Sequence, residues 1–536
     1  MTRILVVGSG ASGVHFAITA LERGFEVALI DTGYQRPVAP EPTASFDGLK
    51  TTLPDPVEYF LGPTDEGVVY PATKPSYYGH PPSKAYVFKI PERFATRSVG
   101  MAPLFSFARG GLAEAWTAGS YEFNRDDLAS FPISAAALTE GYREVARRIG
   151  ITGQPDDLER FIPRDAEYLP PLPLDRHSAL LMERYRARRD SLNTKLGFFL
   201  GRSRVATLSQ PHQGRPACDQ LGRCLWGCPT DAIYSPAVTL RECFRFPAFS
   251  YHPGWLATHF EYDADHRVTG LAATSVDGGD QRGFTADRFV LTAGALASSK
   301  LVLDSIFRRT GTIERLPGLM DNRQIHLPFL LPAMIGQPLE RAAYQFHHLA
   351  FGLEEPNPDE YVHGQITTLR AASVHPIVQS LPLDYLGALG VFRAVRPALG
   401  LANVNLHDRR RPGSFLTIKA LDDGRTELVA EYQDDPAEAG QIERAVRRTG
   451  GALKRLGAII PPGMTRVLPK GASVHYAGTL PMAGSATPLG ATPEGRSWDW
   501  PNLYFGDGAT FPFLPAKNLT FTLMANAVRI ARAMAE

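Results

Sequence analysis

The sequence has little that would tie the chain to a nucleic acid, a disulfide scaffold or a bilayer. Its 56 Lys and Arg nearly balance its 55 Asp and Glu, so no excess charge steers it to nucleic acid or an anionic membrane. Four cysteines are too few for a disulfide scaffold in 536 residues. No apolar run approaches the roughly 20 residues that span a bilayer. The first expected strand begins at Ile4, which leaves no room for a signal peptide, so we expect a cytoplasmic protein with reduced thiols.

A glycine-rich turn near the N-terminus is the first positive signal. Gly8, Gly10 and Gly13 follow the apolar run at residues 4–7 and precede a helix-like stretch, and Asp31 closes the next apolar run. In this strand–turn–helix–strand order the glycines allow a tight turn, close approach of backbone to a pyrophosphate, and packing of helix on strand. The carboxylate of Asp31 can accept hydrogen bonds from the hydroxyls of an adenosine ribose, which suits a ribose that carries no phosphate. The pattern predicts a bound dinucleotide, with Ala11, Ser12 and Thr32 in the same site.

The length is enough for two or three domains and a large core. Residues 34–100 show no sustained period and are expected to be irregular, whereas residues 321–465 mix strand-like runs with prolines, typical of a separate, mostly antiparallel domain. Ser134 is expected to cap a helix that ends near Ile149. Other helices are predicted at 179–189, 436–456 and 523–535, and strands at 256–262, 268–276, 284–292, 361–369, 414–420 and 426–432.

Three further motifs follow in order along the chain. Gly110-Gly-Leu-Ala-Glu-Ala-Trp116 and Thr292-Ala-Gly-Ala-Leu-Ala-Ser298 are glycine junctions, the second between a strand and a helix. The C-terminal part reads His475-Tyr-Ala-Gly-Thr, then Asn502-Leu-Tyr-Phe-Gly-Asp-Gly508, then Asn518-Leu-Thr-Phe-Thr522. This series resembles the glucose–methanol–choline (GMC) flavoprotein oxidoreductases. The two glycine junctions are similar to the flavin-attachment loop and the second nucleotide contact of that family.

The resemblance implies FAD as the dinucleotide and an α/β fold class. It implies a Rossmann-like FAD-binding domain built from discontinuous segments, residues 1–33, 95–160, 211–320 and 466–536. An α+β substrate-binding domain with an antiparallel sheet would then comprise residues 34–94, 161–210 and 321–465. Besides the N-terminal residues, the cofactor-binding residues that the resemblance implies are Arg109, Gly110, Gly111, Trp116, Ala293, Gly294, Asp507, Gly508, Asn518 and Thr520.

Alcohol oxidation needs a base for the hydroxyl proton and a donor that steadies the oxygen, while the flavin accepts the hydride. His475 matches the catalytic histidine of the family, and a neutral imidazole can accept a proton near neutral pH. Asn518 matches the partner position, where an amide can donate to the oxygen without titrating. A buried histidine and a loop-capping asparagine are the plain alternatives. Leu519 replaces the usual proline beside that amide.

Two stretches do not follow the pattern of the family. One lacks the residue to which a flavin could be attached, and the other resembles a metal-binding motif. The loop at residues 113–116 has no histidine that could bond to the flavin, so we expect non-covalent FAD. The segment with Cys218, Cys224 and Cys228 resembles the end of a ferredoxin motif, but a [4Fe–4S] site needs four thiolates, and Leu221 stands where a third closely spaced cysteine belongs. Zinc with a remote ligand is possible, although the spacing is not that of a usual finger. We favour structural thiols and predict no metal.

The substrate class is the least determined part of the sequence. The glycine loop and the Phe131-Pro-Ile-Ser134 segment look most like bacterial members near the pyranose oxidases, which favours a sugar or polyol hydroxyl. An aliphatic or sterol-like alcohol is the second candidate, supported by the Leu- and Phe-rich stretch 381–401. A redox-neutral lyase, isomerase or decarboxylase, or a non-catalytic FAD module, would share the fold. The partner we expect is a small-molecule alcohol, and the motifs do not indicate whether oxygen, a quinone or a protein accepts the electrons.

Overall fold

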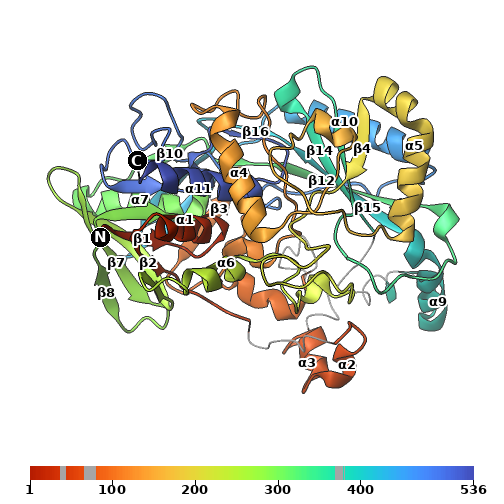
Figure 1. Cartoon of the computed structure of the whole chain (residues 1–536), viewed down its shortest axis with the longest axis horizontal. Helices are drawn as coiled ribbons and strands as arrows, with labels where there is room; N and C mark the ends of the chain where they lie inside the picture. Colours follow the sequence, from red (N-terminus) through yellow and green to blue (C-terminus); the bar gives the residue numbers. More distant parts are fainter. Residues whose placement is uncertain (37–43, 66–79, 369–377, 380, 536) are drawn as a thin grey trace.

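The computed structural model describes residues 1–36, 44–65, 80–368, 378–379 and 381–535. Two large sheets lie side by side in it (Figure 1). A parallel sheet lies near both chain termini, and an antiparallel sheet occupies the other half of the molecule. Parts of the predicted irregular region, residues 37–43 and 66–79, lie outside the described residues. Within the described ranges, no helix combines the length and the apolar character needed to cross a bilayer.

The parallel sheet has five strands in the order β21-β9-β1-β2-β5. Side chains alternate between its faces. Ile4 and Val6 of β1 pack under the helices α1 and α11, while Leu5 and Val7 pack toward the opposite side, where α7 and a three-stranded meander lie. The sheet is therefore a buried central layer. Its strands are β1 (Arg3–Val7), β2 (Glu26–Ile30), β5 (Phe249–His252), β9 (Arg288–Leu291) and β21 (Leu503–Phe505); the meander is β6 (Trp255–Tyr262), β7 (Val268–Ser275) and β8 (Gln281–Phe284).

The antiparallel sheet has six strands in the order β19-β12-β15-β14-β13-β4. Helices α5 and α10 cover its apolar face with the core that contains Ile325, Val404 and Ile366. The other face points toward the parallel-sheet half. The strands are β4 (Phe198–Arg202), β12 (Arg323–Leu330), β13 (Leu349–Leu353), β14 (Val362–Thr368), β15 (Leu399–Leu406) and β19 (Arg466–Val467); the two helices are α5 (Arg176–Leu196) and α10 (Glu438–Arg455).

Smaller elements complete the fold. A four-stranded sheet has the order β10-β17-β18-β3. Two short two-stranded sheets, β11 with β20 and β16 with β22, pair segments that are far apart in the sequence. The strands are β3 (Ala95–Val99), β10 (Arg315–Pro317), β11 (Met320–Asp321), β16 (Asp408–Arg409), β17 (Phe415–Ala420), β18 (Thr426–Glu431), β20 (Tyr476–Ala477) and β22 (Phe513–Leu514). The helices are α1 (Ala11–Glu22), α2 (Leu49–Thr52), α3 (Pro56–Leu61), α4 (Ala135–Ile149), α6 (Pro236–Cys243), α7 (Ala295–Thr310), α9 (Tyr385–Val395) and α11 (Thr520–Ala533).

The predicted helices and most predicted strands are present, with some corrections. Ser134 occupies the N-cap of α4 but makes no side-chain cap hydrogen bond, and the helix predicted at 179–189 extends over the whole of α5, where Asp175 is the cap. The strand predicted at 284–292 divides into β8 and β9, which belong to different sheets. Residues 95–99, predicted to be irregular, form β3. This strand is only half-buried, so it lacks the alternation that reveals most strands.

Candidate active site

The glycine-rich turn leaves open the N-terminus of α1. Gly8 has a φ of +102°, and a Cβ built on Gly13 would lie 1.9 Å from the Gly8 carbonyl oxygen, so turn and helix are in direct contact there. A Cβ on Gly10 would meet nothing within 4 Å. No side chain caps this helix end. The open space at Gly10 beside free N–H groups fits a pyrophosphate, and this is where FAD can be held.

Asp31 follows β2 and is half-buried. Its carboxylate accepts hydrogen bonds from the Ser9 hydroxyl, from the Gly33 N–H at 3.1 Å and from the Ser9 N–H at 3.3 Å. Burial raises the pKa of Asp31 to about 6. The carboxylate also lines the large cavity described below. It is therefore placed where a ribose hydroxyl could reach it, as the spacing predicts, and that role stays a prediction.

The second and third glycine junctions meet this turn. The Gly110 N–H donates to the Ser9 hydroxyl at 3.0 Å, and a Cβ on Gly111 would lie 3.4 Å from the Gly10 Cα. Asp507 receives the N–H of Gly294 at 2.9 Å. The Asp507 carboxylate thus holds the start of α7 against the C-terminal segment, which is a structural role that the motif alone did not indicate.

A cavity of about 1580 Å³ joins these segments. Ligand pockets commonly measure about 300–1,000 Å³, so this one has room for a dinucleotide together with a substrate. Two predicted residues do not line it: Gly13 packs beneath the turn, and Arg109 lines an adjoining cavity of about 450 Å³. The predicted site residues that do line it are Gly8, Gly10, Ala11, Ser12, Asp31, Thr32, Gly110, Gly111, Trp116, Ala293, Gly294, His475, Asp507, Gly508, Asn518 and Thr520.

His475 lies in the wall of this cavity, and its ring is oriented by Asn322. The Nδ1 atom is 2.9 Å from the Asn322 Oδ1. The Nδ2 of Asn322 donates to the carbonyl oxygens of Leu406 and Pro515, at 2.8 and 3.0 Å, so the amide cannot be turned round without losing both bonds. Because Oδ1 can only accept, Nδ1 of His475 carries the proton. Nε2 is then the unprotonated nitrogen.

Burial keeps this imidazole neutral. The pKa of His475 is lowered to about 4 because the charged form would lose its hydration. At neutral pH the ring therefore has one N–H, held by Asn322, and one lone pair. A neutral imidazole with a free lone pair is the form that can take a proton from a hydroxyl group.

Asn518 is oriented in the same way by a second amide. The Gln365 Nε2 donates to the Asn518 Oδ1 at 2.8 Å, and both residues line the cavity. Because the carbonyl end of Asn518 is engaged, its amide nitrogen is the end that can donate to a ligand. Gln365 comes from β14 and Asn518 from the loop before α11. Asn322 was not predicted as a site residue, because no local spacing links it to the imidazole that it orients.

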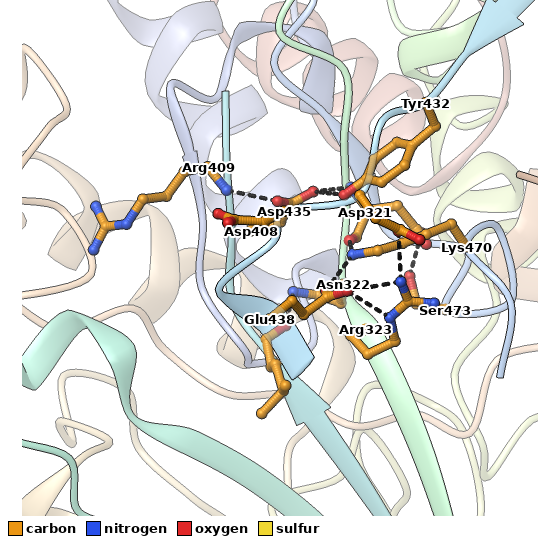
Figure 2. A network of polar contacts seen from close by, with 12 residues as sticks. Asp321, Asn322, Arg323, Asp408, Arg409, Tyr432, Asp435, Glu438, Lys470 and Ser473 are labelled. Atoms are coloured by element: carbon orange, nitrogen blue, oxygen red, sulfur yellow. Dashed lines mark hydrogen bonds and ion pairs between the residues drawn. The ribbon is translucent and has the colours of Figure 1, made fainter. Parts of the chain in front are cut away.

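A buried ionic network holds the segment that leads into His475; Figure 2 shows its members Asp321, Glu438, Lys470 and Ser473. The His475 N–H donates to the Ser473 hydroxyl at 3.0 Å, and that hydroxyl donates to Asp321, the neighbour of Asn322. Lys470 donates to the Asp321 carbonyl oxygen at 2.9 Å and forms an ion pair with Glu438 at 2.8 Å. The network therefore joins β11 and β12 to the segment that carries the imidazole.

Cys218, Cys224 and Cys228 are half-buried and form no disulfide within the described part of the chain. No group of three His, Cys, Asp or Glu that could hold a metal is found among the residues with described positions. Burial raises the pKa of the Cys218 thiol to about 11, so this sulfur is a protonated thiol at neutral pH. The role of the three cysteines stays a prediction.

Comparisons with known proteins agree with this architecture. The family model described as GMC oxidoreductase matches residues 411–527. Paromamine 6'-oxidase of Streptomyces fradiae is 24% identical over 99% of this chain and 91% of its own length. The fructose dehydrogenase large subunit of Gluconobacter japonicus is 22% identical over 56% of this chain and 53% of its length. C-glycoside 3-oxidase of Arthrobacter globiformis is 37% identical over 32% of each chain.

Solved structures share the fold over the whole chain. Pyridoxine 4-oxidase from Mesorbium loti has a TM-score of 0.58 at 15% identity and 99% coverage of both chains. The formate oxidase of Aspergillus oryzae RIB40 has a TM-score of 0.62 at 10% identity, covering 99% of this chain and 98% of its own. Fold and family match together define an oxidoreductase of the flavoprotein class. Residues 411–527 match the C-terminal domain of the GMC oxidoreductases, and the relatives and solved structures named above indicate an alcohol-oxidising oxidoreductase whose cofactor, by the same comparisons, is FAD.

Proposed function

We propose that this enzyme oxidises a hydroxyl group of a sugar or polyol to a carbonyl, with His475 as the base and Asn518 as the donor that steadies the oxygen. The orientation of His475 carries the proposal: Asn322 fixes the proton on Nδ1 and leaves Nε2 unprotonated in the wall of the cavity. The relatives named above support the substrate class, because their names refer to paromamine, fructose and C-glycosides.

The protein residues divide the work between proton transfer and charge stabilisation. The hydroxyl proton passes to Nε2 of His475, and the positive charge that forms on the ring is shared through the Nδ1–H bond to Asn322. The N–H of Asn518 donates to the oxygen as negative charge develops on it. FAD, when bound, supplies the acceptor for the hydride that leaves the carbon. One proton and one hydride lost from the alcohol yield the carbonyl.

We propose that FAD binds without a covalent bond. The attachment-like loop has Ala113, Glu114, Ala115 and Trp116 where a histidine would be needed. Trp116 is itself engaged, since its Nε1 donates to the Tyr234 carbonyl oxygen at 2.8 Å. Acid precipitation of the holoenzyme should leave the yellow colour in the supernatant. A coloured pellet would contradict non-covalent binding.

The case for an aliphatic or sterol-like substrate is weaker in the structure than in the sequence. Within the described part of the apolar stretch 381–401, only Leu401 lines the cavity. Helix α9, which belongs to this stretch, contributes no residue to the cavity wall, and its Leu386 is 75% exposed. The stretch therefore does not form an apolar substrate pocket around His475.

Anaerobic reduction of the flavin tests the proposed function. Neutral sugars and polyols should bleach the flavin absorbance of the wild type, and His475→Gln should slow bleaching by roughly 100-fold or more while FAD stays bound. His266, which is exposed and does not line the cavity, offers the matched control: His266→Gln should bleach at the wild-type rate. Bleaching by no alcohol would favour redox-neutral chemistry or a binding module. Equal rates in His475→Gln and wild type would remove His475 from the mechanism.

A further inference from the structure

One face of the six-stranded sheet is polar although it lies inside the protein. The strand register places Gln324, Asn405 and His363 in one row across β12, β15 and β14. The next row consists of His326, Asn403 and Gln365. Residues directly opposite each other in antiparallel strands point to the same face. We call these six side chains, Gln324, His326, His363, Gln365, Asn403 and Asn405, the carboxamide face.

The carboxamide face adjoins the proposed catalytic pair. Gln324, His326, Gln365 and Asn403 line the same cavity as His475. Gln365 also donates to Asn518, so one row of the face ends directly at the residue proposed to steady the reacting oxygen. The reverse face of the same strands is apolar and covered by α5 and α10. These four polar side chains are therefore directed at the cavity, on the side of the sheet opposite the apolar core.

Several buried polar atoms here have no hydrogen-bond partner within the described part of the chain. They include an acceptor, the Asn403 Oδ1, and a donor, the Asn405 Nδ2. Nε2 of His363 and Nε2 of His347, which enters the cavity wall from the loop before β13, are in the same state. The side chains of the face that do line the cavity, Gln324, His326, Gln365 and Asn403, combine donors with acceptors, and a ligand with hydroxyl groups can match such a mixture because each hydroxyl both donates and accepts.

The six side chains of the face include no carboxylate and no ammonium group. Behind the sheet, the ionised Asp175 is already engaged by Ser178 and Thr368. The fixed charge beside the face is positive: Arg466, opposite His326 across β19 and β12, also lines the cavity. Burial and Arg466 lower the pKa of His326 to about 4, so this ring is neutral as well. The acidic residues of the cavity wall belong to other elements: Asp31, Glu261, Asp304, Asp423 and Asp507.

We propose that the carboxamide face is the substrate subsite and that it selects an uncharged polyhydroxylated alcohol, a neutral sugar or polyol, over an aminosugar and over an apolar alcohol. This inference rests on the proposed function, since His475 and Asn518 mark the reacting end of the cavity. A protonated amine placed here loses its hydration without gaining a counter-ion. An apolar alcohol leaves the amides unsatisfied.

The wild-type holoenzyme tests this selection directly. Flavin reduction is followed with glucose, galactose and mannose, with the corresponding 2-amino sugars at a slightly acidic pH where the amine is protonated, and with hexan-1-ol. Each neutral sugar that reacts should have a kcat/KM about tenfold or more above its amino counterpart and above hexan-1-ol. Equal values, or a preference for the amine or for hexan-1-ol, would overturn the inference and leave the proposed function standing. Reduction by none of these compounds nor by sorbitol would overturn both.

Asn403→Asp tests the role of the face itself, because it adds a carboxylate with almost no change in shape. The ratio of kcat/KM for the amino sugar to that for the neutral sugar should rise about tenfold. Asn357→Asp, on an exposed turn after β13, is the matched control and should leave the ratio unchanged. If Asn403→Asp does not retain FAD, Thr367→Asp in the next row serves in its place. A folded, FAD-loaded variant with an unchanged ratio contradicts the proposal.

Discussion

Two amide side chains decide which atoms of His475 and Asn518 face the cavity. An imidazole and a carboxamide each have one end that donates and one that can accept, so presence in the cavity alone does not define their function. Asn322 resolves the ambiguity for His475, and Gln365 resolves it for Asn518. Both are positioning residues, which act on the reaction through the orientation and ionisation of another side chain.

Asn322→Asp should change the pH dependence of catalysis. A carboxylate beside Nδ1 stabilises the imidazolium form and so raises the pKa of His475 from about 4. Since the base works only when deprotonated, wild-type kcat/KM should fall only near pH 4, and the variant should lose activity about one to three pH units higher. The pH profile of kcat/KM measures this. Superimposable acid limbs would show that Asn322 does not act on the imidazole.

Asn518→Leu should lower kcat by roughly 100-fold, because a donor to the developing oxyanion is worth about that much or more. KM should change less, since the charge on the oxygen is absent in the ground state. Asn518→His, which restores an N–H donor, should recover part of the rate. Steady-state kinetics with a reacting sugar separate the two constants. A loss confined to KM would make Asn518 a binding residue only.

At the scale of elements, local patterns predicted local structure. The strands β1 and β2 with α1 between them were predicted because their period and their glycines lie within about thirty consecutive residues. The carboxamide face was not predicted, since it depends on the register of β12, β15 and β14, which the sequence leaves open. The same holds for β8 and β9: one apolar run contains both, and only tertiary pairing divides them between two sheets.

Lys470→Met should destabilise the network between β11, β12 and α10. Lys470 is 2% exposed, and its removal leaves Glu438 with one fewer cation and the Asp321 carbonyl without its donor. Loss of one member of a buried ion pair costs about 3–5 kcal/mol. Because the same segment carries His475, kcat should fall too. Denaturant unfolding measures the loss, and Arg447→Met, from an exposed pair with Glu443, should cost less than about 1 kcal/mol.

At the scale of the molecule, the cavity is assembled from segments far apart in the chain. The family resemblance predicted which segments form the site. It did not predict that Asn322 and Gln365 orient the proposed catalytic pair, nor that the Asp507 carboxylate accepts the Gly294 N–H and so connects the start of α7 to the C-terminal segment. Those contacts arise only when the two sheets are packed together, so no window of the sequence contains them. The domain boundaries and the cytoplasmic location stay predictions.

FAD that joins these segments should also stabilise the whole fold. A ligand that binds only the native state adds about 2.7 kcal/mol when its concentration is 100 times its Kd. The melting temperature of apoenzyme should therefore rise with added FAD. Gly13→Ala should abolish this rise, because the new Cβ would lie 1.9 Å from the Gly8 carbonyl oxygen and force α1 away from the turn. Gly279→Ala, in an exposed turn where a Cβ meets nothing within 4 Å, should keep it. If Gly13→Ala melts higher with FAD by the same amount as the wild type, the pyrophosphate site is not at this turn.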